Sequence, residues 1–259
     1  MFRFLVFILS KDELYKTCFR NGFGWPHLAA SRIFKWPISC STVSCIFEVR
    51  VMRISVLIFS YNFEDYIQRC VKSVLDQDYQ PMEIICIDDN STDNTYKVLS
   101  ILSKENPKIK LLRNEYNKHQ YNSLNQLNLL RTGLNYSDGD YIFLLDGDDF
   151  WSSKKLLSYQ QAMKDSADFL FDTPVKISNN RTRRELLFAD YMLCENALRL
   201  ITRLELPYFV TGQTSSLGFK RNALENLLKS YSVELPLLWL DLQLGRRAFY
   251  DCGLTKYHS

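Results

Sequence analysis

Four short apolar runs alternate with amphipathic stretches in this chain, and this alternation constrains its fold more than any other feature. The runs have the length of buried strands and occupy residues 54–59, 83–87, 109–112 and 141–145. Between them, apolar residues recur at the 3.6-residue period of a helix. Strands joined by helices pair in parallel through right-handed crossovers. The sequence therefore predicts an α/β fold with a mostly parallel central sheet flanked by helices.

Polar residues follow three of the four runs, at the point where each predicted strand ends. They are Ser60-Tyr61-Asn62, Asp88-Asp89-Asn90-Ser91 and Asp146-Gly147-Asp148-Asp149. The carboxyl ends of parallel strands meet at one edge of a sheet, and ligands bind just beyond that edge. We therefore expect the three groups to form one binding site.

The last of these groups places three carboxylates within four residues, with Gly147 allowing a sharp turn. Carboxylates this close repel one another unless one takes up a proton or a cation binds. Oxygen ligands of this kind suit Mg²⁺ or Mn²⁺. Residues 146–149, called the acidic segment below, therefore predict a metal site that holds a phosphate-bearing substrate. The alternative is an ordinary solvated acidic turn.

Composition narrows the class of protein. The 259 residues are 46% hydrophobic and 24% charged, as in globular proteins, and a net charge of +3 gives no support for nucleic-acid binding. The seven cysteines form no Cys-x-x-Cys pair, so neither a disulfide framework nor a zinc site is expected. No apolar stretch reaches the roughly 20 residues of a spanning helix. A reducing, cytoplasmic location fits these features, either free or at the cytoplasmic face of a membrane.

The regular pattern divides the chain unequally. Residues 1–51 lack periodicity, and we expect them to be a poorly ordered N-terminal extension without a role in function. Residues 52–259 are expected to form one domain, with a nucleotide-binding half at 52–151 and an acceptor-binding half at 152–259. The second half is less regular, and we leave open that it is truncated at its C-terminus. Its predicted elements are strands near 168–171, 216–219 and 254–257, a turn at Asn179-Asn180, and helices through Leu224 and over 239–249.

Three segments carry a family resemblance. Residues 55–62, 83–93 and 143–149, in this order, resemble the family 2 glycosyltransferases of the GT-A fold. The resemblance spans about residues 54–257 and implies an inverting, hexosyltransferase-type enzyme of polysaccharide or glycoconjugate biosynthesis. It implies a nucleotide-sugar donor, UDP-linked in our hypothesis, and a carbohydrate, lipid-linked or protein-linked acceptor, with Mg²⁺ or Mn²⁺ as cofactor. Peripheral association with a membrane is compatible with such acceptors.

The resemblance also implies roles for single residues. Asp148 matches the position that binds the metal, and Asp146 the position that faces the ribose or the metal shell, as a DXD pair around Gly147. Asp88 and Asp89 match the pair that recognises base and ribose, for which a carboxylate can accept hydrogen bonds. Asp146 also counts among the donor-binding candidates, and the remaining ones are Ser60, Tyr61, Asn62, Ser91 and Gly147.

The acceptor half supplies two further candidates. Asp241 matches the carboxylate that deprotonates the acceptor hydroxyl, although Leu240 stands where the family often has Glu. The alternative is a helix N-terminal charge favoured by the helix dipole. His258 resembles the His of a terminal family pattern that reaches the metal or the diphosphate, and a frayed terminal His is its alternative. Gly212-Gln213-Thr214-Ser215-Ser216 resembles the acceptor-side segment.

Other functions fit less well. A nucleotidyltransferase needs a glycine-rich loop after the first strand, where this chain has Phe59-Ser60-Tyr61-Asn62. A dehydrogenase needs a Gly-x-Gly-x-x-Gly motif after a strand, which is absent. A non-catalytic module that binds nucleotide sugars stays open, because of Leu240.

Overall fold

The computed structural model describes residues 52–115, 122–172, 175–178, 181–184, 213–229, 240–251 and 255–258. All of them belong to one unit, Val49–Ser259. The predicted N-terminal extension, residues 1–51, lies outside the described residues.

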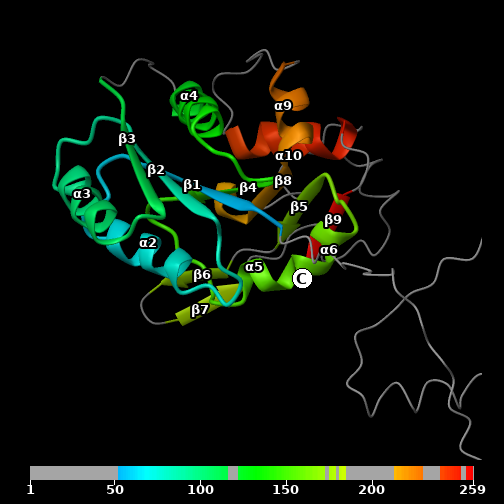
Figure 1. The fold of residues 1–259 in the computed structure, drawn as a ribbon, viewed down its shortest axis with the longest axis horizontal. Coiled ribbons are helices and arrows are strands. Elements are labelled where there is room, and N and C mark those ends of the chain that lie inside the picture. Colours follow the sequence, from blue (N-terminus) through cyan, green and yellow to red (C-terminus); the bar gives the residue numbers. More distant parts are fainter. Residues whose placement is uncertain are drawn as a thin grey trace, which may run out of the picture. The chain divides into compact units, whose positions relative to one another are not determined.

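Four parallel strands form the first part of a seven-stranded sheet (Figure 1). In sheet order β3-β2-β1-β4, they are Ile109–Arg113, Glu83–Asp88, Ile54–Ser60 and Tyr141–Asp146. Helices connect them, as right-handed crossovers require. The four predicted strands are confirmed, each within one residue of its expected end.

Helices cover both faces of the sheet, which is why β1 and β2 are buried along their whole length (Figure 1). Leu57 and Phe59 pack toward α4, α9 and α10, whereas Val56 and Ile58 pack toward α2 and α3. This alternation follows from the two-residue period of a strand. The helices are α2 Ile67–Leu75, α3 Thr95–Glu105, α4 Asn122–Asn135, α5 Lys155–Ser158, α6 Gln160–Lys164, α9 Arg221–Lys229 and α10 Leu240–Asp251.

The acceptor half completes the sheet in the order β4-β8-β5-β9. Strand β8 (Leu217–Lys220) runs antiparallel to both β4 and β5 (Phe169–Asp172), and β9 (Thr255–His258) is parallel to β5. A separate hairpin pairs β6 (Val175–Ser178) with β7 (Arg181–Arg184), with Ser178 opposite Arg181. This register agrees with a two-residue connection at Asn179-Asn180, which itself lies outside the described residues. Within the described part of the chain, no helix is long and apolar enough to cross a membrane.

The amino edge of the sheet is held by a buried carboxylate. Glu83 accepts hydrogen bonds from the Ser55 hydroxyl (2.6 Å) and the Asp138 N–H (2.6 Å), and its second oxygen lies 2.6 Å from the Lys110 Nζ. Burial alone would raise the pKa of Glu83, but the Asp138 N–H, Lys110 and Ser55 together lower it below its ordinary value. The charged carboxylate is therefore the form that the fold stabilises.

We expect Glu83→Ala to lower the free energy of unfolding at pH 7 by about 2–3 kcal/mol, because it leaves a buried N–H and a hydroxyl without their acceptor. A folded-state pKa below the unfolded value of about 4.3 means that this stabilisation is present above that value and is lost as pH falls through the folded pKa. Urea unfolding at pH 7 and pH 3 measures both effects. An unfolding free energy for Glu83→Ala equal to the wild type at pH 7 would contradict the prediction.

Candidate active site

The three polar groups predicted to share a site do share one edge of the sheet. In the strand register, Ser60 lies opposite Asp88, and Phe59 lies opposite Asp146. The ends of β1, β2 and β4 are therefore level with one another. The predicted convergence of the three segments is confirmed by this register.

The loops after β1 and β2 are joined by side chains of two predicted donor-binding residues. The Asn62 Oδ1 accepts a hydrogen bond from the Thr92 N–H (2.9 Å), and the Asn62 N–H donates to the Ser91 hydroxyl (3.0 Å). Asn62 has a left-handed backbone, with φ 57°, which suits a tight turn. The sequence also predicts Asn62 as the N-cap of α2, with Asp65 in an acidic first turn. This prediction is wrong: Tyr66 occupies the cap position without a side-chain cap, and the first turn of α2 contains no acidic residue. Asn62 instead forms the hydrogen bonds that join the two loops.

The side chains of Ser60 and Tyr61 point to different environments. Ser60 is buried and its hydroxyl donates to the Ile87 carbonyl (3.2 Å), so it joins β1 to β2. Tyr61 is 44% exposed at the same edge. Of these two residues, Tyr61 is the one placed to contact a ligand.

Asp88 is the most constrained of the predicted nucleotide-binding residues. It is fully buried, and its Oδ2 accepts from the Ser91 N–H (3.1 Å) and lies 3.3 Å from Arg113 Nε. Its Oδ1 is buried without a hydrogen-bond partner among the described residues. A buried polar atom without a partner is uncommon in proteins and calls for an explanation. The neighbouring Asp89 accepts from the Asn114 amide (2.7 Å).

Arg113 is a site residue that the sequence analysis missed. Besides its contact with Asp88, it donates to the Ser91 carbonyl (3.1 Å) and lies over the Tyr96 ring, 4.3 Å from its centroid. It ends the third strand, so its place at the carboxyl edge was the signal that could have found it.

Gly147 is required for space in the acidic segment. A Cβ at this position would lie 2.9 Å from the Phe59 carbonyl oxygen and 2.9 Å from Phe63. The Gly147 N–H also donates to that carbonyl (2.8 Å). The segment therefore turns directly over the end of β1.

The acidic segment concentrates negative charge. Burial, reinforced by Asp149 and Asp148, raises the pKa of Asp146 to about 8, and Asp241 contributes in the same direction, while a hydrogen bond from Thr214 opposes the shift. Partial desolvation of the carboxyl and the neighbouring Asp149 raise the pKa of Asp148, although much of its side chain is exposed. No described lysine or arginine forms an ion pair with these three carboxylates. Uncompensated carboxylate oxygens are a donor set that fits a hard divalent cation. Among the described residues, no group of three or more His, Cys, Asp or Glu side chains is arranged to hold a metal ion.

A turn from the acceptor half holds the acidic segment in place. The turn is a short 3₁₀ helix, Thr214–Ser216. The Ser215 hydroxyl donates to Asp149 Oδ2 (2.6 Å) and accepts from the Asp146 N–H (3.1 Å). The Trp151 indole N–H donates to the Ser215 carbonyl (2.9 Å). The sequence analysis assigned this turn to the acceptor side, and it did not predict the hydrogen bonds between the turn and the acidic segment.

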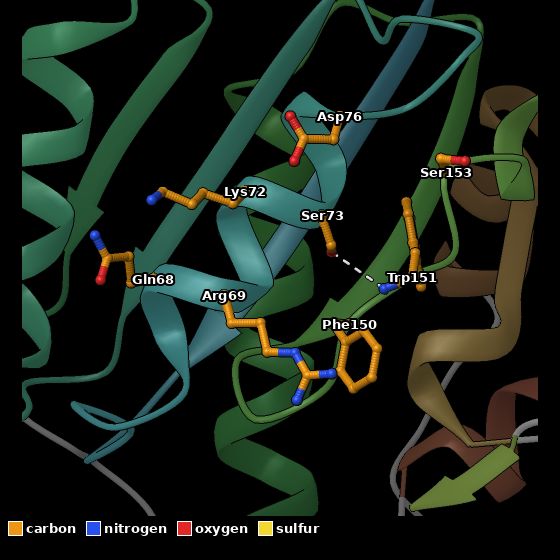
Figure 2. Close-up of a pocket in the computed structure, with 8 residues that line it drawn as sticks. All are labelled: Gln68, Arg69, Lys72, Ser73, Asp76, Phe150, Trp151 and Ser153. Carbon is orange, nitrogen blue, oxygen red and sulfur yellow. Dashed lines mark hydrogen bonds between the residues drawn. The ribbon is translucent and has the colours of Figure 1, made fainter. Parts of the chain in front are cut away.

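Trp151 is also held from the side of α2, beside a surface hollow of ≈ 490 Å³. Figure 2 shows the backbone N–H of Trp151 donating to the Ser73 hydroxyl (3.1 Å) and the Arg69 guanidinium lying over the Phe150 ring. The distance from the Arg69 guanidinium carbon to the Phe150 ring centroid is 3.4 Å. Contacts from two directions therefore fix the chain directly after the acidic segment.

If the acidic segment holds a metal as predicted, Ser215→Ala should reduce turnover at this site about 10-fold, because groups that orient metal ligands have effects of about this size. It also leaves a carboxylate and an N–H without their partner, which costs about 1–2 kcal/mol of stability. Ser216→Ala, in the same buried turn, is the matched control. Steady-state kinetics and urea unfolding measure the two effects. Equal activity of the two variants would contradict the role of the Ser215 hydroxyl.

The two acceptor-half candidates differ in position. Asp241 lies in the first turn of α10, and its charge acts on the pKa of Asp146, so the fold brings it toward the acidic segment. His258 ends β9, opposite Asp172, on the edge where β4 also ends. Strands β8 and β5 separate β9 from β4, which is about 14 Å at the usual strand spacing. The base role of Asp241 and the metal role of His258 both stay predictions.

Comparison with known proteins identifies the family. Residues 55–228 match the family model described as glycosyl transferase family 2. The chain belongs to glycosyl transferase family 2. The resemblance of its three segments is thereby confirmed.

Relatives of this family 2 chain include characterised enzymes. It is 36% identical over 129 residues to the Escherichia coli UDP-Glc:alpha-D-GlcNAc-diphosphoundecaprenol beta-1,3-glucosyltransferase WfgD. The aligned segment covers 49% of this chain and 47% of WfgD. It is 31% identical over 119 residues to a Campylobacter jejuni GalNAc(5)-diNAcBac-PP-undecaprenol beta-1,3-glucosyltransferase, covering 46% of this chain and 37% of that enzyme. The matched segments thus span half or less of these relatives.

Solved structures confirm the predicted GT-A fold. S. aureus TarS in complex with UDP-GlcNAc matches with a TM-score of 0.59 and 19% identity, over 80% of this chain and 56% of that chain. Mannosyltransferase PcManGT from Pyrobaculum calidifontis in complex with GDP-Man and Mn2+ matches with a TM-score of 0.56 and 18% identity, over 80% and 55%. At this identity the likeness concerns the fold alone.

Proposed function

We propose that this protein transfers a hexose from a UDP-sugar to an acceptor hydroxyl with inversion. The observation that carries the donor assignment is the buried Oδ1 of Asp88, which has no partner among the described residues at the edge where ligands bind. A base imino N–H or a ribose hydroxyl would donate to this atom. Tyr61, which is exposed and follows the strand position paired with Asp88, would offer a face for the base. UDP-sugars also serve the E. coli relative and occur in the TarS complex.

Asp148 and Asp146 would hold Mg²⁺ or Mn²⁺, which would neutralise charge on the departing diphosphate. The support is the crowding that raises the pKa of both carboxylates without a described cationic partner. The hydrogen bonds of the Ser215 hydroxyl would hold the Asp149 carboxylate and the Asp146 backbone in position to bind the metal. The PcManGT complex contains Mn2+ on the same fold.

Asp241 would accept the proton of the attacking hydroxyl. A general base must stand near the reacting centre, and its electrostatic effect on Asp146 agrees with such a position.

The acceptor in this proposal is a sugar carried on a polyprenyl diphosphate lipid. The names of the E. coli and C. jejuni relatives specify such acceptors. The protein would then act at the cytoplasmic face of a membrane, in glycoconjugate biosynthesis.

The test of the donor site is UDP binding by Asp88→Asn. We expect UDP with Mn²⁺ to raise the melting temperature of the wild type, since a ligand of the native state stabilises it. Asp88→Asn should bind UDP about 10- to 100-fold more weakly in calorimetry, because hydrogen bonds to charged groups contribute about 1.5–3 kcal/mol. Asp65→Asn, exposed on the neighbouring loop, is the control. If no nucleoside diphosphate binds the wild type, the proposed function is wrong.

A further inference from the structure

The acceptor half contains a buried ion pair that the proposed mechanism does not use. Lys155, on α5, is 8% exposed, and its Nζ lies 2.7 Å from Oδ2 of Asp172, at the end of β5. The rings of Trp151 and Tyr159 lie beside this ammonium group, with centroids 5.2 Å and 6.0 Å from Nζ. Burying a lysine is costly, and an apolar pair in such a place is often equally stable. Stability alone is therefore a weak reason for this pair.

Asp172 stands at the edge of the sheet where ligands bind. Strand β5 is antiparallel to β8, which is antiparallel to β4, so β4 and β5 end at the same edge. One strand separates them, which places their ends about 10 Å apart. Asp172 is thus on the acceptor side of Asp146, and the distance between the two strand ends would accommodate one or two sugar residues.

One of the two carboxylate oxygens of Asp172 accepts a hydrogen bond, and this contact orients the carboxylate. Lys155 binds Oδ2, and no described residue donates a hydrogen bond to Oδ1. The Asp172 side chain is 19% exposed, so it is partly accessible at this edge rather than sealed in the core. A carboxylate of this kind accepts hydrogen bonds from hydroxyl groups.

Lys155 is connected to the acidic segment through Trp151. The Trp151 indole N–H donates to the Ser215 carbonyl, and the Ser215 hydroxyl bonds Asp149. The Trp151 backbone is held by Ser73 (Figure 2). The position of Asp172 relative to the acidic segment is therefore fixed by a continuous set of contacts.

We propose that Asp172, held by Lys155, is a binding residue for hydroxyl groups of the acceptor sugar. This inference rests on the proposed function, and it adds a sugar subsite at the end of β5. Lys155 is a positioning residue in it, because its contact with Oδ2 sets the direction of the carboxylate.

Two variants test the subsite. Asp172→Asn keeps an oxygen for Lys155 but weakens the acceptor for sugar hydroxyls. Asp172→Leu with Lys155→Met replaces the ion pair by apolar side chains, which a merely structural pair should tolerate. The control is Asp168→Asn, a carboxylate of the same half that lies 3.9 Å from the Lys220 Nζ at the other end of β5.

The probes are methyl glycosides of glucose, N-acetylglucosamine and N-acetylgalactosamine, with binding followed by saturation-transfer NMR, and the same sugars as alkyl diphosphates in a transfer assay. We expect both variants to bind the preferred sugar about 10-fold more weakly and to raise its KM, whereas Asp168→Asn behaves as the wild type. Wild-type affinity in the stably folded apolar variant, or no binding of any probe to the wild type, would overturn the subsite.

UDP binding is measured on the same samples. Unchanged UDP affinity with weakened sugar binding supports the subsite, whereas unchanged sugar binding in both variants refutes it and leaves the proposed function standing. A wild type that binds a sugar but no UDP refutes the donor assignment and not the sugar subsite.

Discussion

Asp148→Asn is expected to lower sugar transfer about 1000-fold, the size of effect seen when one group that stabilises developing charge is removed. Asp148 lies at the carboxyl edge of the sheet, and partial desolvation of its carboxyl together with Asp149 raises its pKa, so a bound cation would stabilise its charged form. An amide of the same shape cannot supply that charge. Release of UDP from a UDP-sugar, measured over a range of Mn²⁺ concentrations, reports the effect.

The matched control for this variant is Asp138→Asn, because Asp138 is exposed at the opposite, amino edge of the sheet. It should transfer sugar as the wild type does. Full, Mn²⁺-stimulated activity of Asp148→Asn would contradict a metal role for this residue.

Asp241→Asn is expected to lower kcat about 1000-fold with little change in UDP affinity. General bases contribute about 100- to 10,000-fold, and loss of the base affects the step after the donor has bound. The substitution keeps the size of the side chain at the start of α10. Single-turnover transfer and UDP calorimetry separate the two quantities.

The alternative role of Asp241, a charge at a helix N-terminus, predicts a different result. The free energy of unfolding would fall by about 0.3–1 kcal/mol and transfer would persist. Asp165→Asn, at an exposed site after α6, controls for loss of one negative charge in the acceptor half. Transfer by Asp241→Asn at the wild-type rate would rule out the base role.

The sequence predicted those parts of the fold that depend on local periodicity. The run at residues 54–59 is a strand and the spacing from Ile67 to Leu75 is a helix, because each pattern matches the burial of one element. The helix cap failed for a tertiary reason: Asn62 bonds Thr92, 30 positions away, and is therefore not available to the start of α2. Side chains that can bond locally can also bond across loops, and sequence spacing does not distinguish the two.

The site was predicted where it follows strand ends and missed where distant segments meet. Asp88 and Asp146 were found because each ends an apolar run. Ser215 was given no bonding role because its partners, Asp146 and Asp149, are 69 and 66 positions away. Arg113 also follows an apolar run, but a single basic residue is a weaker sign of a site than a cluster of carboxylates, so its contact with Asp88 was missed.

The distance in sequence between Ser215 and the acidic segment has a consequence for how the molecule assembles. The Gly147 N–H donates to the Phe59 carbonyl, and both residues belong to the first four strands and their loops. The Asp146 N–H donates to the Ser215 hydroxyl, which comes much later in the chain. Loop closure over long separations precedes any gain from the contacts it brings. The nucleotide-binding strands can thus pair while the rest of the chain is still being synthesised. The bonds from Ser215 to Asp146 and Asp149 form only once the second half has docked, so a half-made chain carries the carboxylates without the contacts that orient them.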